Sequence, residues 1–172
     1  MSGNQISETT QLLTFTLGEE VFAVDIAQVR EVLEYSEMTK VPRTPEYMRG
    51  VINLRGHVVP VVDMRLKFGM NASEITVNTC VIIVEVSMGE DSSVLGAMVD
   101  SVKEVLTIEP QNVEPPPRMG TRLNTNFIRG MGKQEDGFVI ILDADRVFSS
   151  DELTMLQQVP GGGAGAMAEA HA

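Results

Sequence analysis

VREVL at residues 29–33 returns as VKEVL at residues 102–106, 73 residues further along the chain. A second block, YMRG at residues 47–50, returns as FIRG at residues 127–130, 80 residues further along. Two matched blocks in the same order indicate an internal duplication. We therefore expect two copies of one small unit, at about 10–70 and 77–150. The distance along the chain between equivalent residues grows from 73 to 80, and a proline-rich loop can hold the seven additional residues.

Outward from these blocks, strand patterns dominate both copies. Short β-branched and apolar runs separated by turn residues predict hairpins and strands, at residues 12–17 with 21–26, 50–54 with 57–64, 77–86 with 94–99, and 137–143. Around five short strands in each copy suit a small closed or nearly closed barrel. A barrel of that size has a packed interior, so we expect binding on an outer face or between the copies.

Composition and charge narrow the function. The chain has 172 residues, 13 Lys and Arg against 24 Asp and Glu, and a net charge of −11. An acidic chain of this kind argues against nucleic-acid binding and against adhesion to an anionic membrane. No apolar run approaches a membrane span, and residues 1–11 do not resemble a signal peptide. The single cysteine excludes an internal disulfide, so a cytoplasmic location is expected.

Catalytic chemistry is poorly supported by the residues. The only histidines are His57, expected on an exposed hairpin arm, and His171, in the Gly/Ala-rich tail. Cys80 opens a β-branched run and is interpreted as a small core residue. Asp63 and Asp143 are equivalent in the repeat and follow strands, where aspartates usually cap a turn. No metal-ligand spacing occurs, so no metal and no cofactor are predicted.

Arg55 differs from these residues because the duplication does not maintain it. It lies in the hairpin NLRG at residues 53–56, and its counterpart in the second copy is Glu135. A residue outside the structural repeat is less needed for the barrel itself, and arginine is enriched where interfaces concentrate binding energy. A solvated turn arginine and a partner contact both remain open on spacing alone. Glu31 and Glu104 are repeated, which favours a structural or surface role for both.

Several blocks together resemble the CheW-like chemotaxis coupling proteins. FTLGEE at 15–20, VDI at 24–26 and VREV at 29–32 resemble the opening of that family, and TPEYMRGVINLRG at 44–56 followed by VPVVDMR at 59–65 resembles its most specific signature. The second half also fits, at GAMVDSV (96–102), FIRG (127–130) and the strand at 140–143. The resemblance covers about residues 10–157.

The resemblance implies an all-β fold of two intertwined SH3-like five-stranded barrels with short helices and a C-terminal helix. The domain would span 11–157, with barrel one at about 11–70, barrel two at about 77–150 and the helix at about 150–158. Residues 1–10 would be disordered and 159–172 a flexible tail. It also implies a non-enzymatic adaptor without cofactors, which couples transmembrane chemoreceptors to the regulatory domain of a CheA-type histidine kinase.

The same resemblance suggests which residues contact these partners. The receptor's cytoplasmic tip would lie in a groove between the barrels, faced by Val29 and Glu31, while Arg55 would tune coupling. The full set of expected partner-binding residues is Val29, Glu31, Gly50, Asn53, Arg55, Cys80 and Leu95. Two alternatives stay open: an adaptor of the same fold in a chemosensory pathway that does not control motility, and a small enzyme with a site in the inter-barrel cleft.

Overall fold

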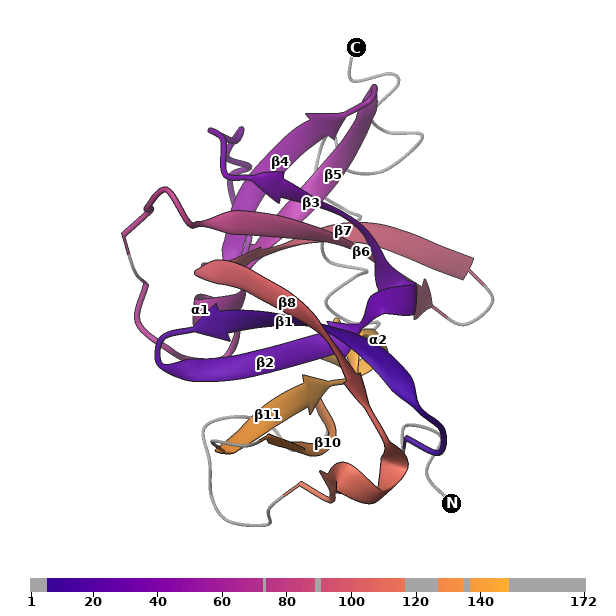
Figure 1. The fold of residues 1–172 in the computed structure, drawn as a ribbon. Coiled ribbons are helices and arrows are strands. Elements are labelled where there is room, and N and C mark those ends of the chain that lie inside the picture. Colours follow the sequence, from indigo (N-terminus) through magenta and orange to yellow (C-terminus); the bar gives the residue numbers. More distant parts are fainter. Residues whose placement is uncertain (1–5, 73, 89–90, 117–126, 135–136, 149–172) are drawn as a thin grey trace.

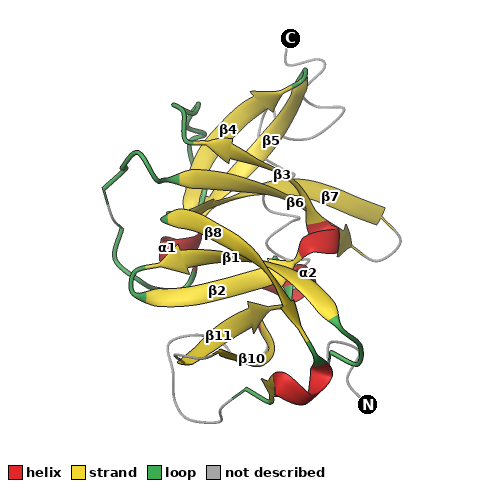
Figure 2. Cartoon of the chain, viewed as in Figure 1, coloured by secondary structure: helices red, strands yellow, loops and turns green. Residues whose placement is uncertain are grey.

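The computed structural model describes residues 6–72, 74–88, 91–116, 127–134 and 137–148 (Figure 1). The elements follow in the order β1 (Thr10–Leu17), β2 (Glu20–Asp25), η1 (Ile26–Gln28), β3 (Val29–Glu34), β4 (Met48–Leu54), β5 (His57–Asp63), α1 (Met64–Lys67), β6 (Cys80–Met88), β7 (Asp91–Val99), β8 (Ser101–Ile108), η2 (Pro110–Asn112), β9 (Val113–Glu114), β10 (Ile128–Gln134), β11 (Gly137–Leu142) and α2 (Ala144–Val147). The predicted all-β fold is confirmed, and the described helices are single turns next to strands (Figure 2). The expected C-terminal helix at 150–158 and the tail lie outside the described residues.

The strands form two sheets, and each sheet takes strands from both copies of the repeat. Sheet A has the order β8-β1-β2-β11-β10-β9, and sheet B has the order β3-β6-β7-β5-β4. The hairpin β1–β2 therefore lies in the lower part of Figure 1 beside β10 and β11, while β3, β4 and β5 of the same copy lie above it. The boundaries 11–70 and 77–150 thus delimit the copies of the repeat, but neither barrel is built from one continuous half of the chain.

The exchange is symmetric down to the register of the strands. In sheet B Leu33 pairs with Val81, and the equivalent residue Leu106 pairs with Leu12 in sheet A. The parallel pairings agree as well, since Val61 lies opposite Gly96 in sheet B, and their equivalents, Ile141 and Ala23, lie opposite each other in sheet A. Each copy keeps two hairpins of its own, and every lateral pairing between those hairpins joins one copy to the other.

Each sheet curls around a small apolar core of its own. The core of sheet B draws on all five strands, with Val59, Val61, Val81, Ile83 and Met98 buried and Leu33, Ile52 and Leu54 packed against them. The core of sheet A takes Leu12, Ala23, Ile108, Val139 and Ile141 from β1, β2, β8 and β11. A cluster shared by strands from both edges of a sheet indicates that the sheet curls around it, which leaves the outer faces for other contacts.

The largest apolar cluster lies between the two sheets. It joins residues from β1, β2, β6, β7 and both short helices, and its rings form a row in which Phe15, Phe22 and Phe68 follow each other at centroid distances of 5.9 Å. A further ring, Phe127, lies 6.1 Å from Phe68. Because this shared core is larger than either barrel's own, the two barrels form one cooperative unit.

The two aspartates at strand ends cap the helical turns that follow, as predicted. The Asp63 carboxylate accepts hydrogen bonds from the backbone N–H groups of Arg65 and Leu66, at 3.0 and 3.2 Å. The Asp143 carboxylate accepts one from the N–H of Arg146, at 3.3 Å. These bonds satisfy N–H groups that a helix start leaves without partners, which explains why the duplication keeps an aspartate at this position.

Candidate partner-binding site

The tip of the β4–β5 hairpin presents an arginine from a strained backbone position. Arg55 and Gly56 have φ angles of 53° and 86°, the two positive values that a two-residue type I′ turn requires. Asn53 accepts a hydrogen bond from the Gly56 N–H at 2.8 Å, which fixes the turn. Asn or Gly suits the first of these positions, whereas a longer side chain costs about 1–2 kcal/mol there. The turn itself does not require an arginine, so the role of this residue lies in the contacts of its side chain.

The Arg55 guanidinium binds the carboxylate of Glu31 with both of its terminal nitrogens. Nη1 donates to Oε2 at 2.7 Å and Nη2 donates to Oε1 at 3.0 Å, which joins the hairpin tip to the edge strand β3. The hydrogen bonds from Arg55 lower the pKa of Glu31, and Glu31 in turn raises the pKa of Arg55. The Arg55 side chain is nevertheless 70% exposed, so the pair contributes little to stability and stays accessible to a partner.

A β-bulge places Val29 and Glu31 on opposite faces of β3. The register between β3 and β6 shifts between these two residues, so that Val29 lies opposite Val84 and Glu31 lies opposite Ile83. Val84 belongs to the core between the sheets, whereas Ile83 belongs to the inner core of sheet B. Paired residues share a face of a sheet. Val29 and Glu31, both expected to face the receptor groove, therefore lie on different faces of β3, because the bulge adds a residue between them.

The outer face of β3, which is the face turned away from the inner core of sheet B, carries exposed apolar side chains. Val32 is 41% exposed, and its repeat equivalent Val105 on β8 is 50% exposed. Their strand partners, Ile82 and Leu13, both belong to the core between the sheets. We call the outer-face valines Val29, Val32, Val102 and Val105 the apolar rim. The sequence reasoning missed Val32 and Val105, although both occupy the same place in the repeated block.

The remaining expected site residues have mainly structural surroundings. Gly50 is buried, and a Cβ atom there would lie 2.7 Å from the carbonyl oxygen of Thr39, which agrees with its expected role in close chain packing. Leu95 is 1% exposed within the core between the sheets, so its side chain has no surface to offer a partner. Cys80 is half-buried at the start of β6, where its Sγ donates to the Asn78 carbonyl at 3.2 Å.

A lysine lies between equivalent aromatic residues of the two copies. The Lys67 Nζ atom is 4.9 Å from the centre of the Tyr47 ring and 5.5 Å from that of Phe127. Burial lowers the pKa of Lys67 to about 8. Burial also raises the pKa of the Tyr47 hydroxyl. The faces of the rings favour the ammonium form, so they oppose the effect of burial on Lys67.

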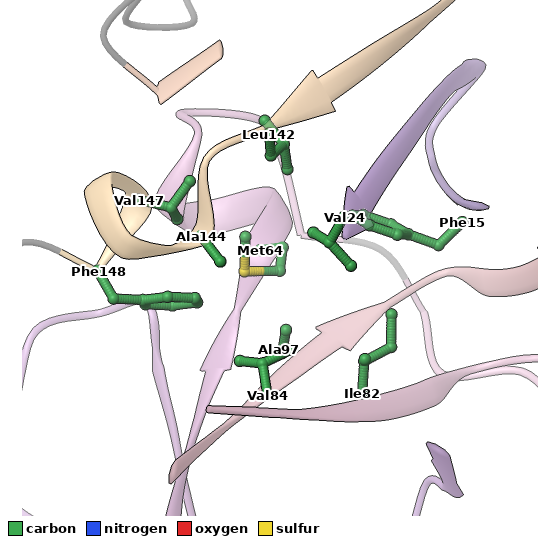
Figure 3. Close-up of a pocket in the computed structure, with 10 residues that line it drawn as sticks. All are labelled: Phe15, Val24, Met64, Ile82, Val84, Ala97, Leu142, Ala144, Val147 and Phe148. Carbon is green, nitrogen blue, oxygen red and sulfur yellow. The ribbon is translucent and has the colours of Figure 1, made fainter. Parts of the chain in front are cut away.

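The cavity between the sheets has the wrong size and lining for catalysis. It measures about 20 Å³, and Figure 3 shows the ten apolar side chains that line it, among them Met64, Ile82 and Leu142. That volume holds about one water molecule, and an apolar lining offers such a water no partner. No cluster of three or more His, Cys, Asp or Glu side chains suited to a metal ion occurs among the described residues. Within the same residues, no helix has the length and apolar character needed to cross a membrane.

The fold and its surface together define a double-barrel β-protein whose exposed strands and hairpin tip, rather than an internal pocket, are available for contact. The model of the CheW-like domain matches residues 11–152. The chain is 34% identical to a chemotaxis protein CheW of Klebsiella aerogenes over 149 residues, covering 87% of each protein. It is 36% identical to a CheW of Rhizobium meliloti over 142 residues, covering 83% of this chain and 89% of that one.

A solved structure agrees with these matches. The scaffolding protein TtCheW from Thermoanaerobacter tengcongensis has a TM-score of 0.74 with this chain at 36% identity, covering 83% of this chain and 94% of that one. The chain belongs to the CheW-like family, and the resemblance seen in the sequence is confirmed.

Proposed function

We propose that this protein is a non-enzymatic adaptor that couples chemoreceptors to a CheA-type histidine kinase. The observation that carries the proposal is the bulge in β3, which gives one edge strand two separate surfaces. Its outer face contributes Val29 and Val32 to the apolar rim, and its inner face contributes Glu31 to the pair with Arg55. Two surfaces on one strand suit a protein that contacts two partners at once.

The apolar rim is the surface proposed for the receptor. A helical receptor tip would present apolar side chains at helical spacing, and such helices bind where exposed apolar residues line a partner's surface. Val32 and Val105 are about half exposed at equivalent positions of the two sheets. The receptor would thus contact both barrels and lie over the core that joins them. This arrangement would recruit the protein to receptors at the cytoplasmic side of the membrane.

The Glu31–Arg55 pair is the surface proposed for tuning the kinase. An adaptor transmits a signal only if its contacts differ between the active and inactive states of its partners. An exposed ion pair held by a strained turn can exchange its partner at low cost, since the pair contributes little to folding. A difference of about 1–3 kcal/mol between the states would account for typical coupling. The regulatory domain of the kinase is the partner that we expect at this surface.

A reconstituted kinase assay tests the proposal. The assay would combine a CheA-type kinase and receptor cytoplasmic fragments from the same organism, with and without this protein, and measure autophosphorylation. We expect receptor-dependent stimulation, and we expect Val32→Asp to reduce receptor binding while Arg55→Ala reduces stimulation with receptor binding retained. Absence of binding to both partners would refute the coupling role. Loss of both functions in both variants would refute the assignment of separate surfaces.

A further inference from the structure

Within one copy of the repeat, pairing of the described residues beyond the hairpins is limited to the two-residue strand β9 on β10 and the single bridge from Thr39 to Val51. Within the described residues, the pairings β1·β8, β2·β11, β3·β6 and β5·β7 all join one copy to the other. The core between the sheets likewise mixes both copies, for example Phe15 and Phe22 of the first with Ile82 and Leu95 of the second. Isolated hairpins are marginally stable in water. Each copy therefore needs a complementary copy, and the fold does not specify that both must come from the same molecule.

The segment that connects the copies contributes little to either barrel. It runs from 71 to 78, between α1 and β6, and all of its described residues are exposed. Val77 is 97% exposed and Ile75 is 38% exposed, so neither apolar side chain is buried in the fold. The hydrogen bonds at its two ends, from Met70 N–H to the Arg65 carbonyl and from Tyr35 N–H to the Thr79 carbonyl, do not require the middle of the segment to keep its path.

We propose that the chain forms a repeat-exchanged dimer with a second copy of itself. In that dimer the first copy of one molecule pairs with the second copy of the other, so that two double barrels form with the same strand pairings and the same cores as in the monomer. Only the two connecting segments change course. Domain exchange of this kind requires no new interface, since it reuses contacts that already exist.

The balance between the two forms depends on concentration and on the length of the connecting segment. In the monomer the segment keeps the copies at a local concentration of about millimolar, which favours the closed form at lower protein concentrations. Shortening the segment hinders closure within one molecule and shifts the balance to the dimer. Interconversion of folded forms requires the separation of four strand pairings and the shared core, so each form persists once it is folded.

The experiment is refolding from denaturant at about 1 µM and about 1 mM, followed by size-exclusion chromatography with light scattering. Three proteins are compared. The first is the whole chain with a protease site inserted between Ile75 and Thr76, the second is the same chain lengthened there by six Gly and Ser residues, and the third lacks residues 74–76. We expect a dimer that increases with refolding concentration, is most abundant in the shortened chain and is least abundant in the lengthened one.

Cleavage of the connecting segment distinguishes exchange from ordinary association. The cut exchanged dimer would separate into particles of monomer mass, each holding one fragment from each molecule, whereas a dimer joined through its surface would keep its mass. A cut dimer that keeps its mass would overturn the proposal. So would a protease-site chain that refolds only as monomer at both concentrations, whatever the folding of the shortened chain.

Discussion

Arg55 reaches across from a hairpin tip to bind both carboxylate oxygens of Glu31, at 2.7 and 3.0 Å, from a residue whose φ is 53°. The backbone at this position favours glycine, and the exposed ion pair offsets only part of that cost. Folding alone would therefore be served at least as well by glycine. The arginine is better explained by what its guanidinium does in a complex than by what it does for the isolated chain.

Replacing this arginine should separate stability from coupling. Arg55→Gly removes the exposed ion pair, which contributes little to stability, but also relieves the strain of a positive φ, so the two small effects oppose each other. We expect a melting temperature within about 4 °C of the natural protein and a loss of roughly tenfold in kinase stimulation. The matched control is Arg43→Gly, because Arg43 is exposed with a φ of 64°. The control should keep full stimulation, and equal loss in both variants would contradict the role of Arg55.

The apolar rim can be tested with a charge on each sheet. Val32→Asp and Val105→Asp place a carboxylate on surfaces that are 41% and 50% exposed, so the fold should tolerate both. If a receptor helix covers the rim, burial of the carboxylate without a partner should weaken receptor binding by at least about tenfold. Val77→Asp is the control, since Val77 is 97% exposed away from the rim. Isothermal titration with a receptor fragment that found three equal affinities would rule out the rim as the receptor surface.

Replacing two glycines that have nearly the same φ angle should reduce the free energy of unfolding by very different amounts. Gly50 has a φ of 154° and Gly137 a φ of 152°. A Cβ atom added at Gly50 would lie 2.7 Å from the Thr39 carbonyl oxygen, whereas a Cβ atom added at Gly137 would have no atom within 4 Å. Gly50→Ala should lose about 2–4 kcal/mol from strain and overpacking combined, whereas Gly137→Ala should lose roughly 1 kcal/mol. Urea unfolding of the two variants measures the difference. Similar losses would mean that backbone angle, and not crowding, decides both positions.

The lowered pKa of Lys67 predicts that stability rises with pH over a defined window. Its pKa is about 8 in the folded chain, against about 10.4 when unfolded, so between these values the unfolded chain binds more protons. The free energy of unfolding then increases as pH rises from 8 towards 9.5. Because solvent screens the site and the Tyr47 and Phe127 rings favour the charged form, we expect a gain of about 1 kcal/mol.

Thermal unfolding at pH 7.5 and pH 9.5 provides the measurement for Lys67. Higher pH values are avoided, because the raised pKa of Tyr47 means that tyrosine ionisation begins to favour the unfolded chain there. Lys67→Met should abolish the part of the pH dependence that comes from this site, while Lys103→Met on exposed β8 should leave it intact. An unchanged profile in Lys67→Met would show that the two rings cancel the effect of burial.

The sequence predicted those features that depend on local pattern. The hairpins, the duplication and the capping aspartates were all readable, because alternation, turn residues and repeated blocks are local signals. The residues did not predict that the hairpin β1–β2 pairs with strands of the other copy. The apolar pattern of β2 is the same whether it pairs with β5 or with β11. The bulge between Val29 and Glu31 was missed for a related reason. Strict alternation predicts that residues two apart share a face, and one additional residue reverses that result.

The exchanged hairpins also decide the order in which the protein can fold during synthesis. Sheet B becomes complete once β7 has left the ribosome at Val99, whereas sheet A must wait for β11, which ends at Leu142. Until then the hairpin β1–β2 holds Leu12 and Ala23, which are buried in the complete protein against Val139 and Ile141 of β11, without those partners. An apolar hairpin that waits for more than a hundred residues is exposed to aggregation. The strands β1 and β2 are thus among the last to gain all of their neighbours, and the nascent chain most needs protection from aggregation at this hairpin.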